Sequence, residues 1–353
     1  MRAARIRTLA VVASAVVAAV VTLEAARSAD GAHVVATWGS HGAEPGQFVG
    51  PFGVAVDHEG FVYVTDSGNH RVQKFTRDGT FVLQWGGRGT GPGTFVKPTG
   101  IAVSPNNTVY VSDYFTDTIQ QFTGDGQFLR MWGKPGTQPG EFDSPAGLAV
   151  GRDGAVYVMD EYNFRVQKFT PEGRFLTAWG TKGKVNVAIS ALNFLFPEDR
   201  EGQFYYPSRL IVGPDHLVYV ADSYNNRIQV FTPEGTFVRK WGGLGFWDGR
   251  FRVTSDLAID AAGQILVADF YNNRIQIFAV DGTYLDQFGE QGQDPGQFDG
   301  PTGLAISLSG DLYVADFHHH RIQRFHLRDH RPASGSVTGA REPGSLRENE
   351  HGP

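Results

Sequence analysis

Short apolar runs, separated at regular intervals by turn residues, recur along most of this 353-residue chain. The clearest example, Val218–Phe231 (VYVADSYNNRIQVF), reads as a strand of β-forming residues, an Asp, an Asn-containing turn and a second strand that opens on Arg. Five further versions begin at Val62, Val109, Val156, Ile265 and Leu312. The pattern predicts a β-hairpin that is used six times.

Each hairpin belongs to a longer repeating unit. An apolar run of the type GLAV precedes it, and a run that usually ends in Trp-Gly, such as Phe237–Gly242 (FVRKWG), follows it. We name the four predicted strands a, b, c and d in chain order. The Asp residues that end the b strands recur every 47 residues, except for 62 residues between the third and fourth. They are Asp66, Asp113, Asp160, Asp222, Asp269 and Asp316. Such a period indicates an array of supersecondary units.

The two ends of the array predict how it closes. The sixth hairpin ends at Phe325 without a d strand, whereas His33–Gly39 (HVVATWG) is a d strand with no a, b or c strand before it. Pairing these two segments would remove both open sheet edges. We therefore predict an all-β fold, a six-bladed β-propeller of four-stranded antiparallel blades that is closed by the N-terminal strand.

The segments outside the repeats predict the domain boundaries. Residues 1–28 combine early Arg residues, an apolar run too short to span a bilayer and small residues near Ser28, which is typical of a cleaved signal peptide. We expect a secreted or periplasmic protein, with an uncleaved membrane anchor facing outside as the alternative. The propeller is expected at 33–328, with an insertion at about 181–206 that contains an apolar stretch. The polar, non-periodic residues 329–353 predict a disordered tail.

The D-x-x-N-x-R-I-Q-x-F hairpin, preceded by P-x-G-[VIL]-A-[VI] and followed by W-G, resembles the NHL repeat family of six-bladed propellers. The resemblance covers about Trp38 to Phe325 and suggests an exported protein of bacterial type. That family includes RNA-binding domains, protein-interaction and sensor domains of bacterial envelope proteins, and zinc-dependent peptidylglycine amidating lyases. The resemblance thus implies the fold and leaves several functions open.

Charge and cysteine content narrow these functions. The formal net charge is −6, and removal of residues 1–28, with four Arg and one Glu, makes it −9. Because binding to nucleic acid depends on neutralising phosphates, we expect no nucleic-acid partner. The chain has no Cys, which excludes disulfides and Cys-bound zinc. We expect a monomer that binds a protein, peptide or carbohydrate ligand, and that meets a membrane only if the N-terminal segment is uncleaved.

Departures from the repeat mark candidate site residues. The Asp, Asn and Arg of each hairpin are explained by turn chemistry and an Asp–Arg pair. In the second hairpin Thr118 replaces the Arg, so we expect Asp113 to lack that partner, and Asp117 adds a charge. Arg209 and Asp256 replace the Gly of the P-x-G motif. They are expected side by side at the mouth of the central channel, either as a ligand-binding pair or as a private salt bridge.

Aromatic residues occupy hairpin tips where turns are normally polar. Aromatic and Arg side chains are common in interface hot spots, so we predict that the ligand-binding face carries the b–c and d–a loops. The alternative is that these rings pack on neighbouring loops. The residues are Tyr114, Phe115, Tyr162, Phe164, Tyr224, Phe270, Tyr271 and Phe317.

Loop histidines raise the question of a metal. His41, His70 and His318 fall on the same predicted face, and imidazoles suit divalent transition metals. In the resembling amidating lyases, two zinc-binding His occupy the x of P-x-G-like motifs. In this chain no such position is His, and only His70 matches their third, hairpin position. We predict no cofactor and a binding or sensor module. The alternative is a metal-assisted hydrolase or lyase at the channel mouth.

Overall fold

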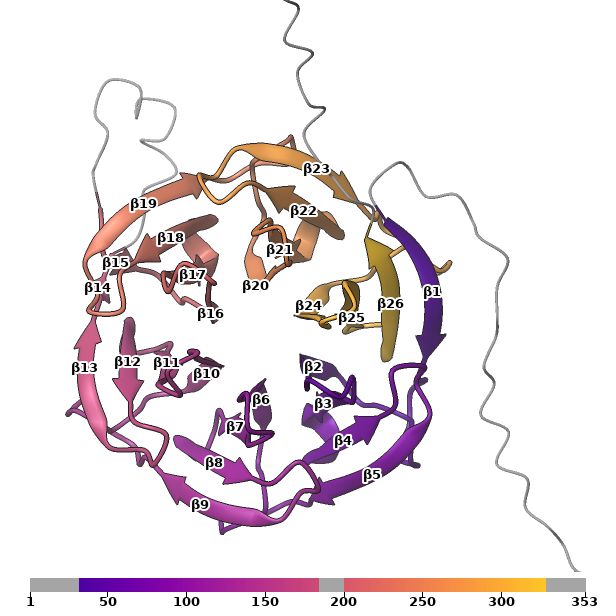
Figure 1. The fold of residues 1–353 in the computed structure, drawn as a ribbon, viewed down its shortest axis with the longest axis horizontal. Helices are drawn as coiled ribbons and strands as arrows, with labels where there is room; N and C mark the ends of the chain where they lie inside the picture. The colour runs from indigo at the N-terminus through magenta and orange to yellow at the C-terminus, as the bar shows by residue number, and fades with distance from the viewer. Residues whose placement is uncertain (1–31, 184–199, 328–353) are drawn as a thin grey trace, which may run out of the picture.

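The computed structural model of the chain describes residues 32–183 and 200–327. Six four-stranded antiparallel sheets surround a central axis, and this confirms the predicted six-bladed propeller (Figure 1). The predicted signal peptide, the predicted tail and most of the predicted insertion lie outside the described residues. Within 32–183 and 200–327, no helix is long and apolar enough to cross a lipid bilayer.

The first three blades follow the chain from the axis outward. Blade 1 contains β2 (Pro51–Val56), β3 (Val62–Asp66), β4 (Arg71–Phe75) and β5 (Phe81–Gly86). Blade 2 contains β6 (Pro98–Val103), β7 (Val109–Asp113), β8 (Thr118–Phe122) and β9 (Phe128–Trp132). Blade 3 contains β10 (Pro145–Val150), β11 (Val156–Asp160), β12 (Arg165–Phe169) and β13 (Phe175–Trp179). Strands a to d of the repeat are thus the four strands of each blade.

The later blades repeat this order, with one short addition. Blade 4 contains β16 (Arg209–Val212), β17 (Val218–Asp222), β18 (Arg227–Phe231) and β19 (Phe237–Gly242). Blade 5 contains β20 (Thr254–Ile259), β21 (Ile265–Asp269), β22 (Arg274–Phe278) and β23 (Tyr284–Phe288). A two-residue parallel pair, β14 (Thr181–Lys182) with β15 (Gln203–Phe204), joins the two ends of the insertion. Short 3-10 turns follow three b strands at Ser67–Asn69, Ser223–Asn225 and Phe270–Asn272.

Blade 6 is built from both ends of the domain. It contains β24 (Pro301–Ile306), β25 (Asp311–Asp316), β26 (Arg321–Leu327) and β1 (Ala32–Trp38). β1 pairs antiparallel with β26, from Ala32↔Leu327 to Trp38↔Ile322, and in Figure 1 the indigo β1 lies beside the yellow β26. The predicted closure by the N-terminal strand is therefore confirmed.

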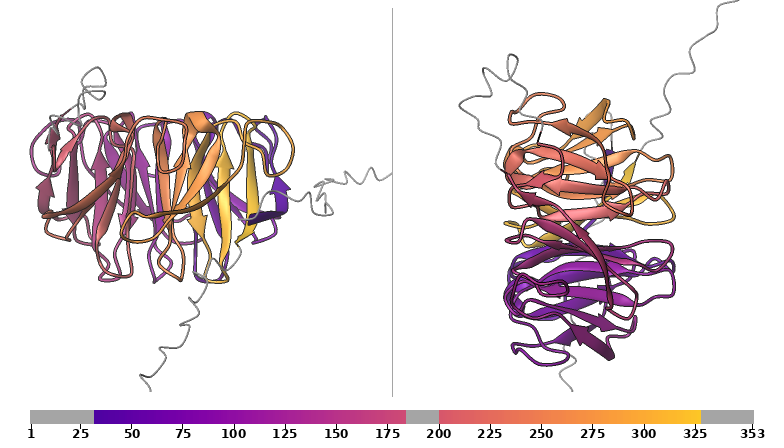
Figure 2. Two further views of the ribbon diagram at one scale, coloured as in Figure 1. Left: turned by 90° about the horizontal axis from the view of Figure 1, so that it is seen from above. Right: turned by 90° about the vertical axis from the view of Figure 1, so that its left-hand side faces the viewer.

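Seen from the side, the molecule is a squat cylinder with connections gathered at its two ends (Figure 2). We call the end with the b–c and d–a connections the loop face, and the end with the a–b and c–d turns the turn face. Apolar residues pack between neighbouring blades. Trp38 of blade 6, for example, contacts Phe75 of blade 1 at a ring-centroid distance of 6.0 Å. The strand-d aromatics thus pack between neighbouring blades.

A hydrogen-bond network at the hairpin ends fixes the loop face. In blade 1 the Arg71 guanidinium pairs with Asp66 (Nε–Oδ2 2.7 Å) and donates to three carbonyl groups of the preceding d–a loop. Asn69 donates to Asp66 and to the same loop. The corresponding Asp–Arg pairs are present in blades 3 to 6. The structural interpretation of the repeated Asp, Asn and Arg is confirmed.

Blade 2 solves the missing Arg differently. Asp113 is fully buried and accepts hydrogen bonds from the backbone N–H groups of Val96 (2.6 Å) and Lys97 (2.8 Å). Asp113 thus lacks an Arg partner, as expected, but it is not left unpaired. A buried carboxylate needs donors. The Val96 amide has an equivalent in blade 1, from Val49 to Asp66, so the Lys97 amide is the additional donor in blade 2.

Candidate functional site

The central channel is closed near the loop face by Arg209 and Asp256. Both side chains lie on the axis but are only 3% and 6% exposed, so they do not form an open mouth as expected. The first residues of the a strands approach closely here, because a Cβ added at Gly303 would lie 2.4 Å from the Phe52 carbonyl. The strands converge at this end of the axis and leave room for two side chains only beneath the surface.

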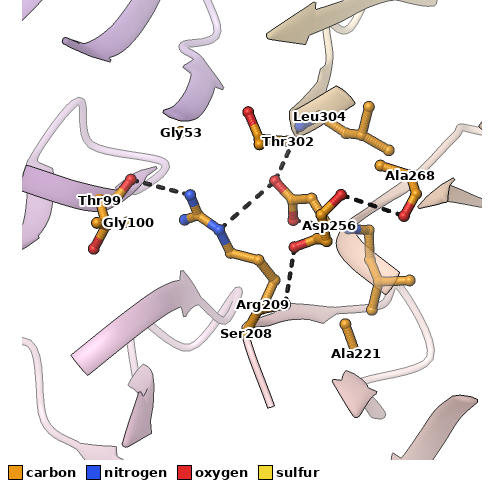
Figure 3. A network of polar contacts seen from close by, with 12 residues as sticks. Gly53, Thr99, Gly100, Ser208, Arg209, Ala221, Asp256, Ala268, Thr302 and Leu304 are labelled. Carbon is orange, nitrogen blue, oxygen red and sulfur yellow. Dashed lines mark hydrogen bonds and ion pairs between the residues drawn. The ribbon is translucent and has the colours of Figure 1, made fainter. Parts of the chain in front are cut away.

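Arg209 reaches across the ring to another blade. Its Nη2 donates to the Thr99 carbonyl in blade 2 (3.0 Å), and its guanidinium lies 5.3 Å from the centre of the Phe52 ring. A Cβ added at Gly147 would lie 2.6 Å from the Arg209 Cδ. The glycines retained in other blades therefore provide the space that this long side chain occupies (Figure 3).

Asp256 is the counter-ion of Arg209, at a Nε–Oδ2 distance of 4.0 Å. Its carboxylate accepts the backbone N–H groups of Leu257 (2.7 Å) and Leu304 (2.9 Å). Burial raises the pKa of Asp256 to about 6, although Arg209 and the two amides oppose this shift. Burial likewise lowers the pKa of Arg209. The two charges partly balance each other, as the salt-bridge alternative predicted, although the Arg209 Nε makes no hydrogen bond to Asp256.

The hairpin tips place aromatic rings on the loop face. The second residue after the repeated Asp points outward where it is aromatic, and it is 62% exposed at Phe115, 45% at Tyr162, and 54% at both Tyr224 and Tyr271. The first residue after the Asp is half-buried where it is aromatic, at Tyr114, Phe270 and Phe317. Both alternatives for the aromatic tips are therefore partly realised, according to position in the turn.

The fourth residue after the b-strand Asp attaches each hairpin turn to the next blade. It adopts a left-handed conformation, as at Asp117 (φ 56°) and Asn226 (φ 55°), and its side chain binds the next blade. Asp117 accepts the Ser144 N–H (2.6 Å), and Asn226 accepts the Val253 N–H (2.8 Å). Asp117 is therefore a connector between blades 2 and 3.

Tyr206 joins the rings of Tyr114, Tyr162 and Tyr224, on blades 2 to 4, into one group of contacts. It lies just before β16, with ring-centroid distances of 5.1 Å to Tyr162 and 5.6 Å to Tyr224. Tyr162 in turn contacts Tyr114 at 6.5 Å. We use "aromatic surface" for this set: Tyr114, Phe115, Tyr162, Tyr206, Tyr224, Phe270, Tyr271 and Phe317. The sequence interpretation missed Tyr206, because it was counted within the insertion.

Phe246 and Trp247 also lie on a loop-face connection and were missed. Their side chains are 74% and 55% exposed, and the rings contact each other at 5.2 Å. Arg274 holds the Trp247 carbonyl, so this backbone faces inward and the side chains face out. A signal was present in the sequence: four equivalent d–a loops have small or polar residues at these positions, as in HGAEPGQF and QGQDPGQF, whereas this loop reads LGFWDGRF.

Charged groups accompany the aromatic surface. Lys97 lies over the rings of Tyr114 (4.7 Å) and Phe115 (4.9 Å), and the exposed Arg252 lies 5.9 Å from the Tyr271 ring. Glu161 sits between blades 2 and 3 and accepts a hydrogen bond from the Tyr114 hydroxyl. Burial raises the pKa of Glu161 to about 7, despite that hydrogen bond and the nearby Lys97.

The three candidate histidines do not converge. The His70 Nδ1 bonds to the Val96 carbonyl (2.7 Å), His318 packs on Phe317, and His41 contacts His320 at 4.7 Å between ring centres. Among residues 32–183 and 200–327, no group of three or more His, Asp or Glu side chains is arranged to hold a metal ion. The structure thus gives these three histidines separate surroundings.

Comparison with known proteins supports the repeat assignment. Five segments match the NHL repeat family, residues 48–75, 142–169, 204–231, 251–278 and 298–325. With its six blades, the chain is an NHL-repeat β-propeller. The corresponding segment of blade 2, in which Thr118 replaces Arg, is not among those matched. A 47-residue stretch is 45% identical to the B-box type zinc finger protein ncl-1 of Caenorhabditis elegans, and this covers 13% of the chain and 6% of that protein.

Solved structures share the fold at low sequence identity. A streptogramin B lyase aligns with a TM-score of 0.56 at 14% identity, covering 82% of this chain and 96% of the lyase. A gluconolactonase from Xanthomonas campestris aligns with a TM-score of 0.58 at 15% identity, covering 87% of this chain and 98% of the lactonase. At such identities the likeness concerns the fold alone.

Proposed function

We propose that this chain is an exported NHL-repeat propeller that binds a protein partner through the aromatic surface. The observation that carries the proposal is the row of exposed rings at successive hairpin tips, two of which, Tyr162 and Tyr224, are joined by Tyr206. Aromatic side chains on rigid turns contribute contact area at low entropic cost and dominate interface hot spots. The hydrogen bonds that hold each turn to the next blade provide that rigidity.

The geometry of the rings favours protein over carbohydrate. Tyr206 meets Tyr162 at an interplanar angle of 72° and Tyr224 at 68°, so the rings present edges and notches and no flat platform. Lys97 and Arg252 at the margin add positive charge to a domain that is acidic as a whole. A protein segment with apolar and acidic side chains fits this surface best.

Peptide selection tests the proposal. Random peptides displayed on phage would be selected on the immobilised propeller, and the affinities of the selected peptides measured by fluorescence polarisation. We expect a Tyr162→Ser/Tyr224→Ser/Tyr271→Ser variant to weaken binding at least about tenfold, because each substitution removes a ring that we expect to be a hot spot of the interface. The matched control reverses charges on the turn face with Asp78→Lys and Glu172→Lys, and it should bind normally.

Three outcomes would contradict the proposal. Loss of binding in the turn-face control alone would show that the partner binds the turn face. Saturable binding to immobilised oligosaccharides, with no peptide selected, would assign the surface to carbohydrate. Residues 1–28 found intact by mass spectrometry of protein from the native host would contradict cleavage and leave the membrane-anchored alternative.

The metal-assisted alternative has less support. The donors it would use are held apart, because the His70 Nδ1 is bonded to a backbone carbonyl and His318 packs among aromatic rings. Metal analysis of the purified protein would test it directly. A stoichiometric transition metal that is lost on substitution of His70, His41 or His318 would revive the hydrolase or lyase interpretation.

A further inference from the structure

The central channel is a cavity that is closed at the loop face by Arg209 and Asp256 and opens toward the turn face, and backbone groups of the a strands form much of its lining. Its volume is about 310 Å³, and apart from Arg209 and Asp256 every residue that lines it is Val, Ile, Leu or Ala. The last residues of the a strands, such as Val56 and Ile259, are half-buried, whereas Arg209 and Asp256 at the other end are buried. A molecule that entered from the turn face would first meet strand backbone with aliphatic side chains, and then a charged pair at the closed end.

Arg209 has hydrogen-bond donors to spare at that closed end. A guanidinium carries five N–H donors, but among the described residues Arg209 makes one hydrogen bond, from Nη2 to Thr99. Its buried Nε has no hydrogen-bond partner among them, because Asp256 Oδ2 lies 4.0 Å away. Leaving a buried charged donor unpaired is costly, so an anionic group at this position would be stabilised.

We propose that the channel is a binding site for a small amphipathic carboxylate, with its carboxylate at Arg209 and its apolar tail along the a strands. This site is separate from the aromatic surface and does not depend on the proposed function. At the packing density of protein interiors, about 0.74, the cavity holds a ligand of roughly a dozen non-hydrogen atoms. Octanoate and decanoate have this size and shape. Contacts of their methylene groups with the Val, Ile, Leu and Ala side chains would add to the attraction of Arg209 for the carboxylate.

Asp256 makes such binding depend on pH. Its partners in the channel are the Arg209 guanidinium from β16, the Leu304 N–H from β24 and its own Leu257 amide, and no further charged side chain lines the cavity. An ionised Asp256 competes with the ligand for Arg209. Since its pKa is about 6, it gains a proton as the pH falls through that value. An alkyl carboxylate, like a Glu side chain with a pKa of about 4.3, is still ionised there.

Isothermal titration calorimetry with octanoate as the probe tests the inference. We expect saturable binding to the wild-type protein that is several-fold tighter at about pH 5.5 than at about pH 7.5. Octanol, which has the same tail and no charge, should bind equally at both pH values. Acetate, which has the charge and almost no tail, should not bind measurably. Absence of saturable octanoate binding would overturn the inference, and the channel would then hold only water.

Two substitutions separate the charge from the cavity. Arg209→Met keeps an apolar side chain of similar length and should weaken octanoate at least about tenfold without affecting octanol. Asp256→Asn removes the competing charge, so octanoate should bind at about pH 7.5 as tightly as the wild type does at about pH 5.5. Equal octanoate affinity in all three proteins would overturn the role of Arg209. If Arg209→Met does not fold, the Asp256→Asn comparison and the wild-type pH series decide the question.

Discussion

Two regions at the loop-face end of the propeller, the hairpin tips and the closed end of the channel, show opposite outcomes of departures from the repeat. At the loop face, aromatic residues replace polar ones at hairpin tips such as Tyr224 and Tyr271, and the turn geometry projects them into solvent. At the closed end of the channel, charged residues replace glycine at Arg209 and Asp256, and the strand geometry buries them. The same kind of sequence change therefore yields surface at one position and an internal ion pair at the other, because the backbone decides where a side chain points.

Removal of β1 should have the largest effect, since it opens the ring on which both regions are built. Deletion of His33–Gly39 exposes the edge of β26 and removes Trp38 from its contacts with Phe75 and Tyr313. We expect a loss of about 5 kcal/mol or more and a fall in Tm above about 10 °C, measured by thermal unfolding. Val35→Ser on the exposed side of β1 is the control. A deletion that melts within about 2 °C of the parent would contradict closure by β1.

Arg209→Met should destabilise strongly and in a pH-dependent way. It leaves Asp256 buried without its cation, which typically costs about 3 kcal/mol where the carboxyl is ionised. Arg209 holds the pKa of Asp256 down, so in its absence the carboxyl stays protonated to a higher pH. The loss measured by urea unfolding should therefore be small near pH 5 and grow as the pH rises above about 6.

Two further variants sharpen this test of the channel end. Replacing both partners, with Arg209→Met and Asp256→Leu, should recover much of the lost stability because no unpaired charge is left. Arg130→Met, at an exposed arginine, should change stability by less than about 0.5 kcal/mol. An equal loss of unfolding free energy for Arg209→Met at pH 5 and pH 8 would show that Arg209 stabilises the fold by packing and not by its charge.

The raised pKa of Glu161 predicts an intermediate effect on the free energy of unfolding when this loop-face residue is replaced. Its folded pKa of about 7 lies above the ordinary value of 4.5, so the stability due to this group is fully present below about pH 4.5 and is lost as the pH rises through about 7. Glu161→Gln removes this dependence. We expect the variant to match the wild type near pH 4.5 and to be more stable by about 1 to 2 kcal/mol near pH 8.

Urea unfolding at both pH values measures this difference, and Glu59→Gln at an exposed site is the matched control. Burial is the cause of the raised pKa, since the hydrogen bond from Tyr114 favours the ionised form. A variant that is less stable than the wild type at pH 8 would mean that the ionised carboxylate is well solvated or well paired at this surface.

The repeat made most of the fold predictable. The site was harder to predict because it is formed by residues of different repeats that meet only in the folded structure. Six registered copies predicted the blades and the closure by β1, because each copy carries its own strands and turns. The donors that bind Asp113 are backbone N–H groups, and these cannot be recognised from the residue types in the sequence. The burial of Arg209 depends on how closely six strands approach one axis, which no single repeat encodes. Phe246 and Trp247 could have been found by aligning the d–a loops as the hairpins were aligned.

The smallest expected effect on stability belongs to the aromatic tips, and it separates surface from core within one face. Tyr224→Ser with Tyr271→Ser should lower the free energy of unfolding by less than about 1 kcal/mol, because both rings are about half exposed. Phe164→Ser, on the same face but buried against Tyr205 and Tyr206, should cost about 3 kcal/mol. Equal losses from the two variants would mean that the tip rings belong to the core of the loop face, and the surface would then have little left with which to bind a partner.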